Sequence, residues 1–401
     1  MLLNLIIIFA IYTAFKIALS ILQIKFIKAQ LREKAVILDE ASYHQAGVVA
    51  DENEKFSIAS SLFSFFIFLI WATWGLSALQ NALINNTSDI TQQTIFVVAF
   101  LIMQSILWLP FDIYEKFIKD KRQGFSNINA KLFALDTVKT IALTVIFGGA
   151  FVWVLLWIMQ KSPNLWWLIG FCFSFGVILM INLIYPTLIA PIFNKMTPLT
   201  DSELSSKITE LLNRCGFKSS GVFVMDASRR DGRLNAYFGG LGASKRVVLF
   251  DTLLLKLENS EILAVLGHEL GHFKHKDILK MLALSAFMLF VIFFVFGNMP
   301  ASVYSALGIN SGGGILVFLL LFSSAFSLIF SPIIGAFSRQ NEFNADKFGS
   351  QMQNKNDMIN ALKKLGSENK AFPKSHPLYS AIYHSHPSLY ERISELSGES
   401  S

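Results

Sequence analysis

The chain has 401 residues, of which 53% are hydrophobic and only 15% are charged, and its mean hydropathy is +0.50. This composition excludes an ordinary soluble enzyme and indicates a membrane protein with several spans. The net charge of +6 is small for this length, so we expect no nucleic-acid partner. Its two cysteines, Cys172 and Cys215, predict no disulfide framework.

Apolar stretches long enough to cross a membrane recur along the chain. Each approaches the roughly 20 residues that a spanning helix requires. The first has no basic start and no small-residue cleavage site, so we interpret it as a span and not as a signal peptide. The sequence predicts seven spans, at about residues 2–24, 57–80, 94–114, 135–160, 165–188, 279–298 and 313–337.

Basic residues alternate between the segments that join these spans. The loops after the first and third spans are rich in Lys and Arg, whereas residues 81–93 and 299–312 contain neither. The long segment 189–278 and the C-terminal tail are basic again. The positive-inside rule then predicts that the N-terminus lies outside and the C-terminus in the cytoplasm.

Part of the long segment between spans five and six is polar enough to fold outside the membrane. A capping box at Thr200–Glu203 predicts an amphipathic helix that runs to about Arg214 and is ended by Gly216. Gly221–Met225 and Arg246–Phe250 are rich in Val and Phe, which is typical of short strands.

Residues 235–238, which begin with Asn235, precede the second of these strands. They could form a loop or strand with a buried aromatic pair, or an edge that binds substrate. We also expect the strand Arg246–Phe250 to hold an extended substrate by β-pairing.

The sequence His268-Glu269-Leu270-Gly271-His272 carries the clearest chemistry. On a helix, positions i and i+4 share a face, so both imidazoles can reach one ion. Glu269 can hold and deprotonate a water at that ion, as in zinc peptidases. The preceding residues are helix-like, with Asn259 or Ser260 expected as N-cap.

A third ligand is needed, and Glu342 is the best candidate, because two His and one Glu leave the fourth position open. Asp346 follows four residues later on the same helical face. It is expected to accept a hydrogen bond from a ligand His. His275 fits the ion poorly, because it lies only three residues after His272.

The C-terminal part begins with a helical pattern over residues 339–365 and continues as a polar tail. His386 and Arg392 in this tail would usually be surface residues. In an active site, either could bind the developing oxyanion or a substrate carboxylate.

These patterns predict a mostly α-helical membrane protein with an inserted α+β zinc-peptidase domain. Residues 1–188 form an N-terminal membrane domain with five spans, and residues 189–278 form the first part of the peptidase domain. Residues 279–337 hold spans six and seven, and residues 338–401 complete the peptidase domain in the cytoplasm.

Several motifs in this order resemble the type I CAAX prenyl endopeptidase family of integral-membrane zinc proteases. The resemblance covers nearly the whole chain. It rests on Phe125 to Lys139, Tyr185 to Asn194, Asn235 to Phe238, Lys245 to Leu254, His268 to His272, Glu342 to Asp346, and His386-Pro387 with Arg392.

The resemblance implies a ring of seven tilted helices around a large water-filled chamber that the zinc domain closes. It implies one zinc ion per chain, bound by His268, His272 and Glu342, with Glu269 as base. It also implies that Asn235, His386 and Arg392 contact substrate or stabilise the transition state. The implied activity is hydrolysis of peptide bonds near the C-terminus of prenylated proteins.

Two other functions stay open. One is that of the heat-shock-induced membrane proteases of bacteria, which share the zinc motifs but have fewer spans. The other is a non-proteolytic membrane binder or transporter, which the intact Glu269 disfavours because a binder needs no base there. Expected partners are membrane lipid and a peptide or protein substrate, for which a lipidated C-terminus is one option; the oligomeric state stays open. The membrane would be the cytoplasmic membrane of a bacterium or the endoplasmic reticulum of a eukaryote.

Overall fold

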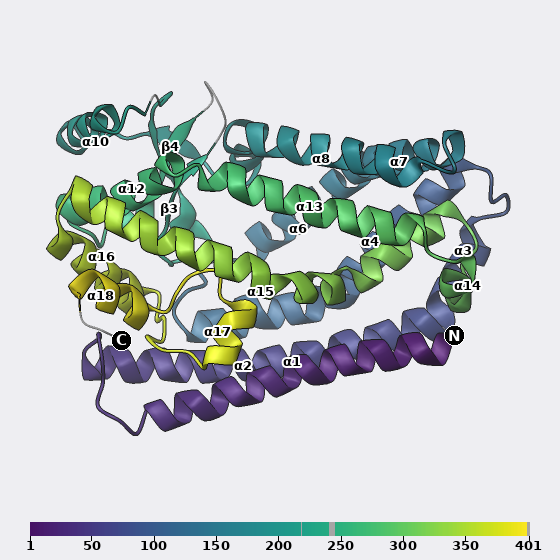
Figure 1. Cartoon of the computed structure of the whole chain (residues 1–401), viewed down its shortest axis with the longest axis horizontal. Helices are drawn as coiled ribbons and strands as arrows, with labels where there is room; N and C mark the ends of the chain where they lie inside the picture. Colours follow the sequence, from purple (N-terminus) through teal and green to yellow (C-terminus); the bar gives the residue numbers. More distant parts are fainter. Residues whose placement is uncertain (218, 240–244, 399–401) are drawn as a thin grey trace.

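A computed structural model describes residues 1–217, 219–239 and 245–398 of the chain. Within these residues, seven helical segments are long and apolar enough to cross a membrane, which confirms the predicted number. They run along the long axis of the molecule, and the two termini lie at opposite ends of it (Figure 1). The segments are Leu2–Gln30, Glu40–Leu83, Ile90–Arg122, Ala130–Lys161, Trp166–Phe193, Asp277–Gly297 and Gly312–Met352.

Four of the seven segments combine α-helices with a short π-helical segment, whose turns are wider than α-helical turns. The pairs joined in this way are α2 (Glu40–Ile70) with α3 (Leu76–Leu83), α4 (Ile90–Tyr114) with α5 (Asp120–Arg122), α6 (Ala130–Leu143) with α7 (Gly149–Lys161), and α8 (Trp166–Ile184) with α9 (Ala190–Phe193). The remaining three are α1 (Leu2–Gln30), α13 (Asp277–Gly297) and α15 (Gly312–Met352).

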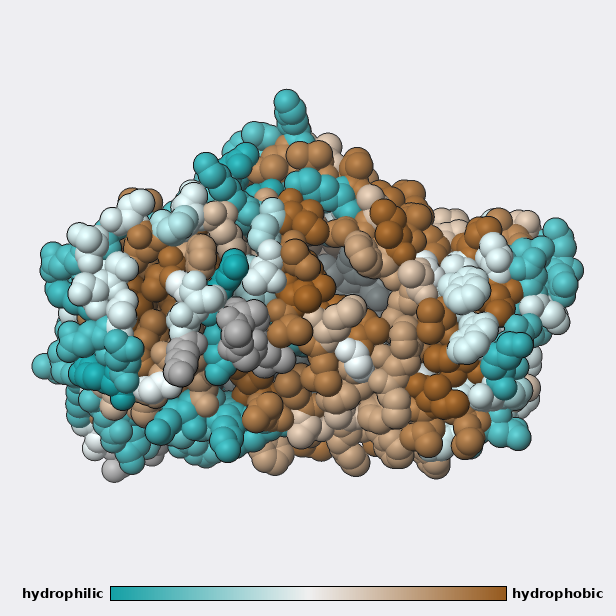
Figure 2. Space-filling view, turned by 90° about the horizontal axis from the view of Figure 1, so that it is seen from above, coloured by the Kyte–Doolittle hydropathy of each residue, from teal (hydrophilic) through white to brown (hydrophobic). Residues whose placement is uncertain are grey.

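On the face that Figure 2 shows, hydrophobic side chains cover most of the middle, and hydrophilic ones gather toward the two ends and at the upper edge. The membrane-spanning segments also carry exposed apolar residues, such as Leu3, Phe147 and Ile329. Such a band is expected where helices face hydrocarbon, because their backbone polar groups are already paired within each helix. Figure 2 also shows a hollow among the apolar side chains of this face, while an enclosed chamber stays a prediction.

Phenylalanine rings fill the interior between the spans, which accounts for much of the high Phe content. Phe9 and Phe68 stack with ring centroids 3.9 Å apart, and Phe322 meets Phe68 edge-on at 5.5 Å. All three rings are buried. These contacts join α1, α2 and α15. Stacked and edge-to-face aromatic pairs stabilise such packing beyond the free energy gained from burying the rings.

A small sheet and several helices gather at the end of the molecule opposite the N-terminus (Figure 1). The sheet has the order β1-β2-β4-β3, with β2 and β4 parallel and the outer pairs antiparallel. Its strands are β1 (Met196–Pro198), β2 (Val222–Met225), β3 (Ala236–Gly239) and β4 (Arg246–Phe250). The helices at this end are α10 (Ser202–Arg214), α11 (Asp251–Leu254), α12 (Asn259–Lys274), α16 (Lys355–Glu368) and α18 (Leu389–Ser397).

The sheet confirms the strands expected around Gly221–Met225 and Arg246–Phe250 and corrects the role of the second. Residues 236–239 form strand β3, which pairs with β4 in the register Ala236↔Leu249. Because β4 lies between β2 and β3, both of its edges are occupied, and it cannot pair with a substrate. The edge strand near the site is β3.

Helix boundaries differ from expectation by one or a few residues. The N-cap of α10 is Asp201 and not Thr200, because the Asp201 carboxylate accepts from the backbone of the first turn. Gly216 ends α10 with φ +66°, as predicted. The N-cap of α12 is Glu258, which forms a capping box with Glu261, and not Asn259 or Ser260.

Helix α15 extends without interruption from the membrane-spanning part into the end of the molecule that holds the sheet. Its 41 residues include the last predicted span and Glu342. The helix expected over residues 339–365 is therefore divided, because α15 ends at Met352 and α16 begins at Lys355. A short helix, α17 (Pro377–Tyr383), then contacts α1 and α15 before the chain reaches His386.

Candidate active site

Helices α12 and α15 cross in near contact, and glycines allow this approach. A Cβ on Gly271 would lie 2.9 Å from the Cα of Ala345, and one on Gly349 would lie 2.7 Å from the backbone nitrogen of His268. Such distances leave no room for a side chain. This packing explains why Gly271 lies between the two histidines, although a glycine destabilises a helix by roughly 1 kcal/mol relative to Ala.

The crossing brings three metal-binding side chains together. His268 Nε2 lies 3.2 Å from His272 Nε2 and 3.4 Å from Glu342 Oε2. His272 Nε2 lies 3.3 Å from Glu342 Oε1. Ligand atoms placed tetrahedrally around one ion at about 2.1 Å are about 3.4 Å apart. The three residues therefore have the spacing of a single metal site.

The hydrogen-bond pattern also fits a cation. Both histidines present Nδ1 to a carboxylate, so Nδ1 carries the proton and Nε2 directs its lone pair toward the other ligand atoms. Glu342 Oε2 is buried without a hydrogen-bond partner among the described residues. Convergence of these electron-rich atoms is unfavourable unless a positive charge lies between them.

Asp346 orients the first histidine from the next turn of α15. His268 Nδ1 lies 2.7 Å from Asp346 Oδ1, which is the contact expected from the sequence. Arg392 donates to both oxygens of Asp346, at 2.7 Å and 2.6 Å. Its guanidinium is thus already paired, which favours a role in holding Asp346 over a role in binding a substrate carboxylate.

Asp277 orients the second histidine, and the sequence did not single it out. Its Oδ2 lies 3.1 Å from His272 Nδ1, while its Oδ1 accepts from Lys280 Nζ at 2.9 Å. Lys276 has the left-handed φ of 58°, and it forms the turn between α12 and α13 just before Asp277. The sequence signal that could have identified Asp277 is an acidic residue five positions after His272, the second histidine of the motif.

Glu269 lines a pocket of about 370 Å³ that also contains His268 and Glu342. Burial raises the pKa of the Glu269 carboxyl, whereas the neighbouring histidines lower it less. A raised carboxyl pKa suits a group that must take a proton and later return it.

The same pocket contains the remaining predicted site residues. Asn235 lies at the start of β3, and its side-chain oxygen accepts from the backbone of Ala236. His386 Nε2 lies 3.2 Å from Glu342 Oε1. Arg339 on α15 donates to the backbone oxygens of Ser380 and His384, which fixes the chain just before His386.

Protonation of the histidines opposes metal binding, so the pKa values of His268 and His272 determine how metal affinity depends on pH. Burial alone would lower the pKa of His268, but its contacts with the Asp346 and Glu342 carboxylates outweigh burial and raise the pKa to about 9. Burial likewise opposes the charge on His272, and its contact with Glu342 again raises the pKa. Below about pH 9, the metal-free protein therefore holds at least one proton that a metal must displace.

We expect metal affinity to rise with pH between 6 and 8, by about tenfold per unit for each displaced proton. Titration calorimetry of the metal-free protein, in buffers of different ionisation enthalpy, measures the number of protons released. Release of no proton at pH 7 would contradict this account of His268.

Comparison with known proteins agrees with this geometry. Residues 198–400 match the family described as peptidase family M48, and residues 23–195 match the CAAX prenyl protease N-terminal region with five membrane helices. The chain belongs to the CAAX prenyl protease family of membrane metallopeptidases. The resemblance noted in the sequence is therefore confirmed.

Individual relatives extend over most of the chain. The CAAX prenyl protease 1 homolog of Dictyostelium discoideum is 35% identical, over 84% of this chain and 81% of that protein. CAAX prenyl protease 1 of Saccharomyces cerevisiae is 30% identical, over 90% and 86%. The crystal structure of S. mikatae Ste24p matches 98% of both chains with a TM-score of 0.90 and 28% identity.

Membership of this family establishes a multi-pass membrane metalloendopeptidase that acts on a peptide or protein substrate and uses a metal ion. It disfavours the heat-shock-type protease and the non-proteolytic binder or transporter.

Proposed function

We propose that this enzyme cleaves peptide bonds near the C-terminus of prenylated proteins, using one zinc ion bound by His268, His272 and Glu342. The observation that carries the proposal is the convergence of these three side chains on one point, beside a pocket that His268, Glu342 and Glu269 line. The relatives named above are CAAX prenyl proteases, which supports the substrate class.

When bound, a zinc ion would polarise the scissile carbonyl and acidify a water molecule beside it. Glu269 takes the proton of the attacking water and passes it to the amine that leaves. Its raised pKa supports the first step, because a carboxylate with a raised pKa accepts a proton more readily.

We propose that Asn235 and His386 act on the carbonyl oxygen of the substrate. Both line the pocket with Glu269, and neither is needed as a metal ligand. We assign them to donating hydrogen bonds as negative charge develops on that oxygen. Arg392 acts through Asp346, which it holds against His268.

The outer edge of β3 is the proposed binding place for the substrate backbone. The backbone N–H of Phe250 donates to the backbone oxygen of Asn235. In this antiparallel pair the backbone polar groups of Asn235 therefore point toward β4, and those of Ala236 point away from β4. The Ala236 N–H, which now meets only the Asn235 side chain, can donate to an extended peptide.

This arrangement should favour flexible C-terminal tails. We expect a farnesylated peptide tail to be cleaved at least about tenfold faster than the same residues in a surface loop of a folded domain. A tail brings one chain segment to the pocket between β3 and α16 and can adopt the reactive orientation, whereas a loop is held at both ends. Mass spectrometry of the products measures both rates. Equal cleavage of tail and loop would remove the tail preference while leaving the peptidase chemistry intact.

We further propose that the end of the molecule that holds the sheet and the active site lies in the cytoplasm, as the alternation of basic loops indicates. In a variant without Cys172 and Cys215, a cysteine replacing Asn86 or Ser305 should react with an impermeant reagent added outside. A cysteine replacing the exposed Glu395 should not react. The opposite labelling pattern would place the active site outside.

A further inference from the structure

The short helix α17 depends on neighbouring helices for its position. It has seven residues, and none of them is buried. A helix of this length is not stable alone, because most helical stability in proteins comes from packing. α17 lies against α1 and α15 (Figure 1), and it ends at Tyr383, just before the segment that carries His386. The contacts that fix α17 therefore also fix the start of that segment.

Hydrogen bonds attach both ends of α17 to these two neighbours. On α1, the Gln23 side-chain oxygen accepts from the backbone nitrogen of His376 at 2.9 Å. On α15, Arg339 donates to two backbone oxygens at the C-terminal end of α17. Gly335, one turn earlier on α15, permits this approach, because a Cβ there would lie 3.0 Å from the backbone oxygen of His384.

A further hydrogen bond joins the middle of α17 to α2. The Tyr379 hydroxyl donates to Glu54 Oε1 at 2.5 Å. Burial raises the pKa of the Tyr379 hydroxyl, and the neighbouring Glu54 carboxyl raises it further. Tyr379 therefore keeps its proton and stays the donor. This bond connects the second spanning segment of the chain to the helix that precedes His386.

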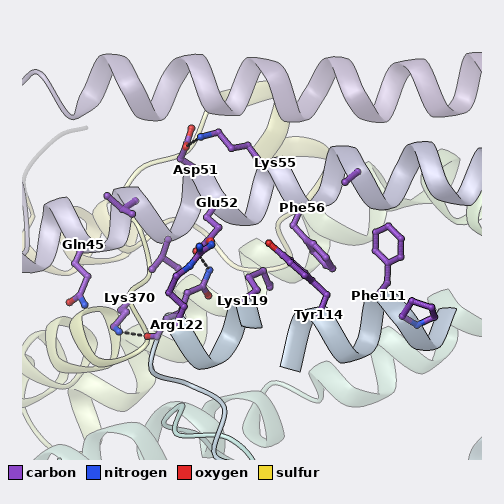
Figure 3. Close-up of a pocket in the computed structure, with 15 residues that line it drawn as sticks. Gln45, Asp51, Glu52, Lys55, Phe56, Phe111, Tyr114, Lys119, Arg122 and Lys370 are labelled. Carbon is purple, nitrogen blue, oxygen red and sulfur yellow. Dashed lines mark hydrogen bonds and ion pairs between the residues drawn. The ribbon is translucent and has the colours of Figure 1, made fainter. Parts of the chain in front are cut away.

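Glu54 is an unusual residue for its position on α2. It lies in a spanning segment and is only 8% exposed. Glu52 and Phe56 point from α2 into a pocket of about 840 Å³ beside α4 and α5 (Figure 3). Glu54 is two residues from each, which places it on the opposite side of the helix.

The Glu54 carboxyl is buried at a cost. Its Oε2 has no hydrogen-bond partner among the described residues, so the bond from Tyr379 is made by one oxygen alone. An apolar side chain would be buried there more favourably than a carboxyl with an unpaired oxygen. Ionisable side chains in spanning segments are costly and are usually retained for a function.

His386 is weakly held by contacts of its own. Its side chain is 60% exposed, and its Nδ1 lies 2.9 Å from the hydroxyl of the adjacent Ser385. Its Nε2 nevertheless lies 3.2 Å from Glu342 Oε1. On the far side of His386, α18 is fixed by the pair of Arg392 and Asp346. The place of the imidazole therefore depends on the two anchored helices that flank it.

We propose, on the basis of the role assigned to His386, that Glu54 and Tyr379 are positioning residues of the peptidase. Their hydrogen bond ties α17 to α2 and thereby keeps His386 beside the scissile carbonyl. A misplacement of about 1 Å can cost about 100-fold in rate, so a bond that touches neither metal nor substrate has a measurable effect on turnover.

Steady-state kinetics of the full chain tests the proposal. Tyr379→Phe removes only the hydroxyl. We expect its kcat to fall about tenfold while KM and metal content stay unchanged, as for an interaction that acts in the transition state. Rates are measured on a farnesylated peptide and on the same peptide without the farnesyl group, so that the comparison of variants does not depend on the proposed substrate class.

Two changes at Glu54 test the same bond from its other side. Glu54→Leu should lower kcat as Tyr379→Phe does. Glu54→Gln should keep most of the activity, because its amide oxygen still accepts from Tyr379. Tyr383→Phe is the matched control and should keep full activity, because Tyr383 lies on the same helix and its hydroxyl has no hydrogen-bond partner among the described residues. This set of variants remains informative if Tyr379→Phe is unstable.

His386→Ala separates positioning from a general effect on the fold. Its kcat should fall further than that of Tyr379→Phe, and combining the two changes should cause no additional loss. Metal content and the unfolding temperature verify that each variant is folded. Equal activity of Glu54→Leu and Glu54→Gln, or an additional loss in the combined variant, would overturn the proposal and leave the role of His386 intact. Normal turnover of His386→Ala would instead remove that role, and the positioning of His386 with it.

Discussion

Replacing Glu269 with Gln is expected to reduce the rate of peptide hydrolysis by at least about 100-fold while the metal stays bound. General-base catalysis accelerates such reactions by a factor of about 10²–10⁴. Glutamine has nearly the same shape, so the pocket is preserved, but its amide cannot accept the proton of water. His268 and His272 keep their own contacts with Asp346 and Asp277. Parallel assays of metal content and of peptide cleavage measure both expectations.

The control for this variant is Glu210→Gln, an equivalent change on the exposed face of α10. It should retain full activity and metal content. Near-normal turnover of Glu269→Gln would exclude Glu269 as the base. Loss of the metal together with activity would instead show that the residue supports the ligands.

Replacing Glu342 with Ala should weaken metal binding by more than about 100-fold. Loss of a residue that only orients a metal ligand already lowers metal affinity about 10–100-fold. The variant leaves two histidines, whose facing nitrogens no longer share an anionic neighbour. His275→Ala should bind metal normally, because His275 lies at the end of α12 with its ring against Phe348. Metal affinity measured by competition with a coloured chelator distinguishes the two.

If His275→Ala loses the metal and Glu342→Ala retains it, the proposed ligand set is wrong. Asp277→Asn provides an intermediate case, because it should keep His272 in place but weaken its orientation. We expect its metal affinity to fall between those of the other two variants.

The features that the sequence predicted best depend on regular spacing. Histidines four residues apart, and a Glu and Asp four residues apart, must share helical faces wherever the helices lie. The seven spans follow from length and hydropathy in the same way. Each of these inferences requires only local geometry.

The features that were missed depend on where elements meet. Strand β3 was ambiguous because four residues carry little periodic signal, and only the sheet order shows that β4 is central. Asp277 reaches His272 through the left-handed turn at Lys276, where Lys gives no indication of positive φ. The pairing of Arg392 with Asp346 joins segments 46 residues apart, which no local pattern reveals.

Helix α15 is at once the last membrane span and the carrier of Glu342. Synthesis proceeds from the N-terminus, so His268 and His272 are made before the proposed third ligand. Glu342 can join them only after α13 and α15 have both been inserted. A nascent chain therefore lacks a complete metal site throughout its biogenesis, and proteolytic activity appears only when assembly in the bilayer is finished.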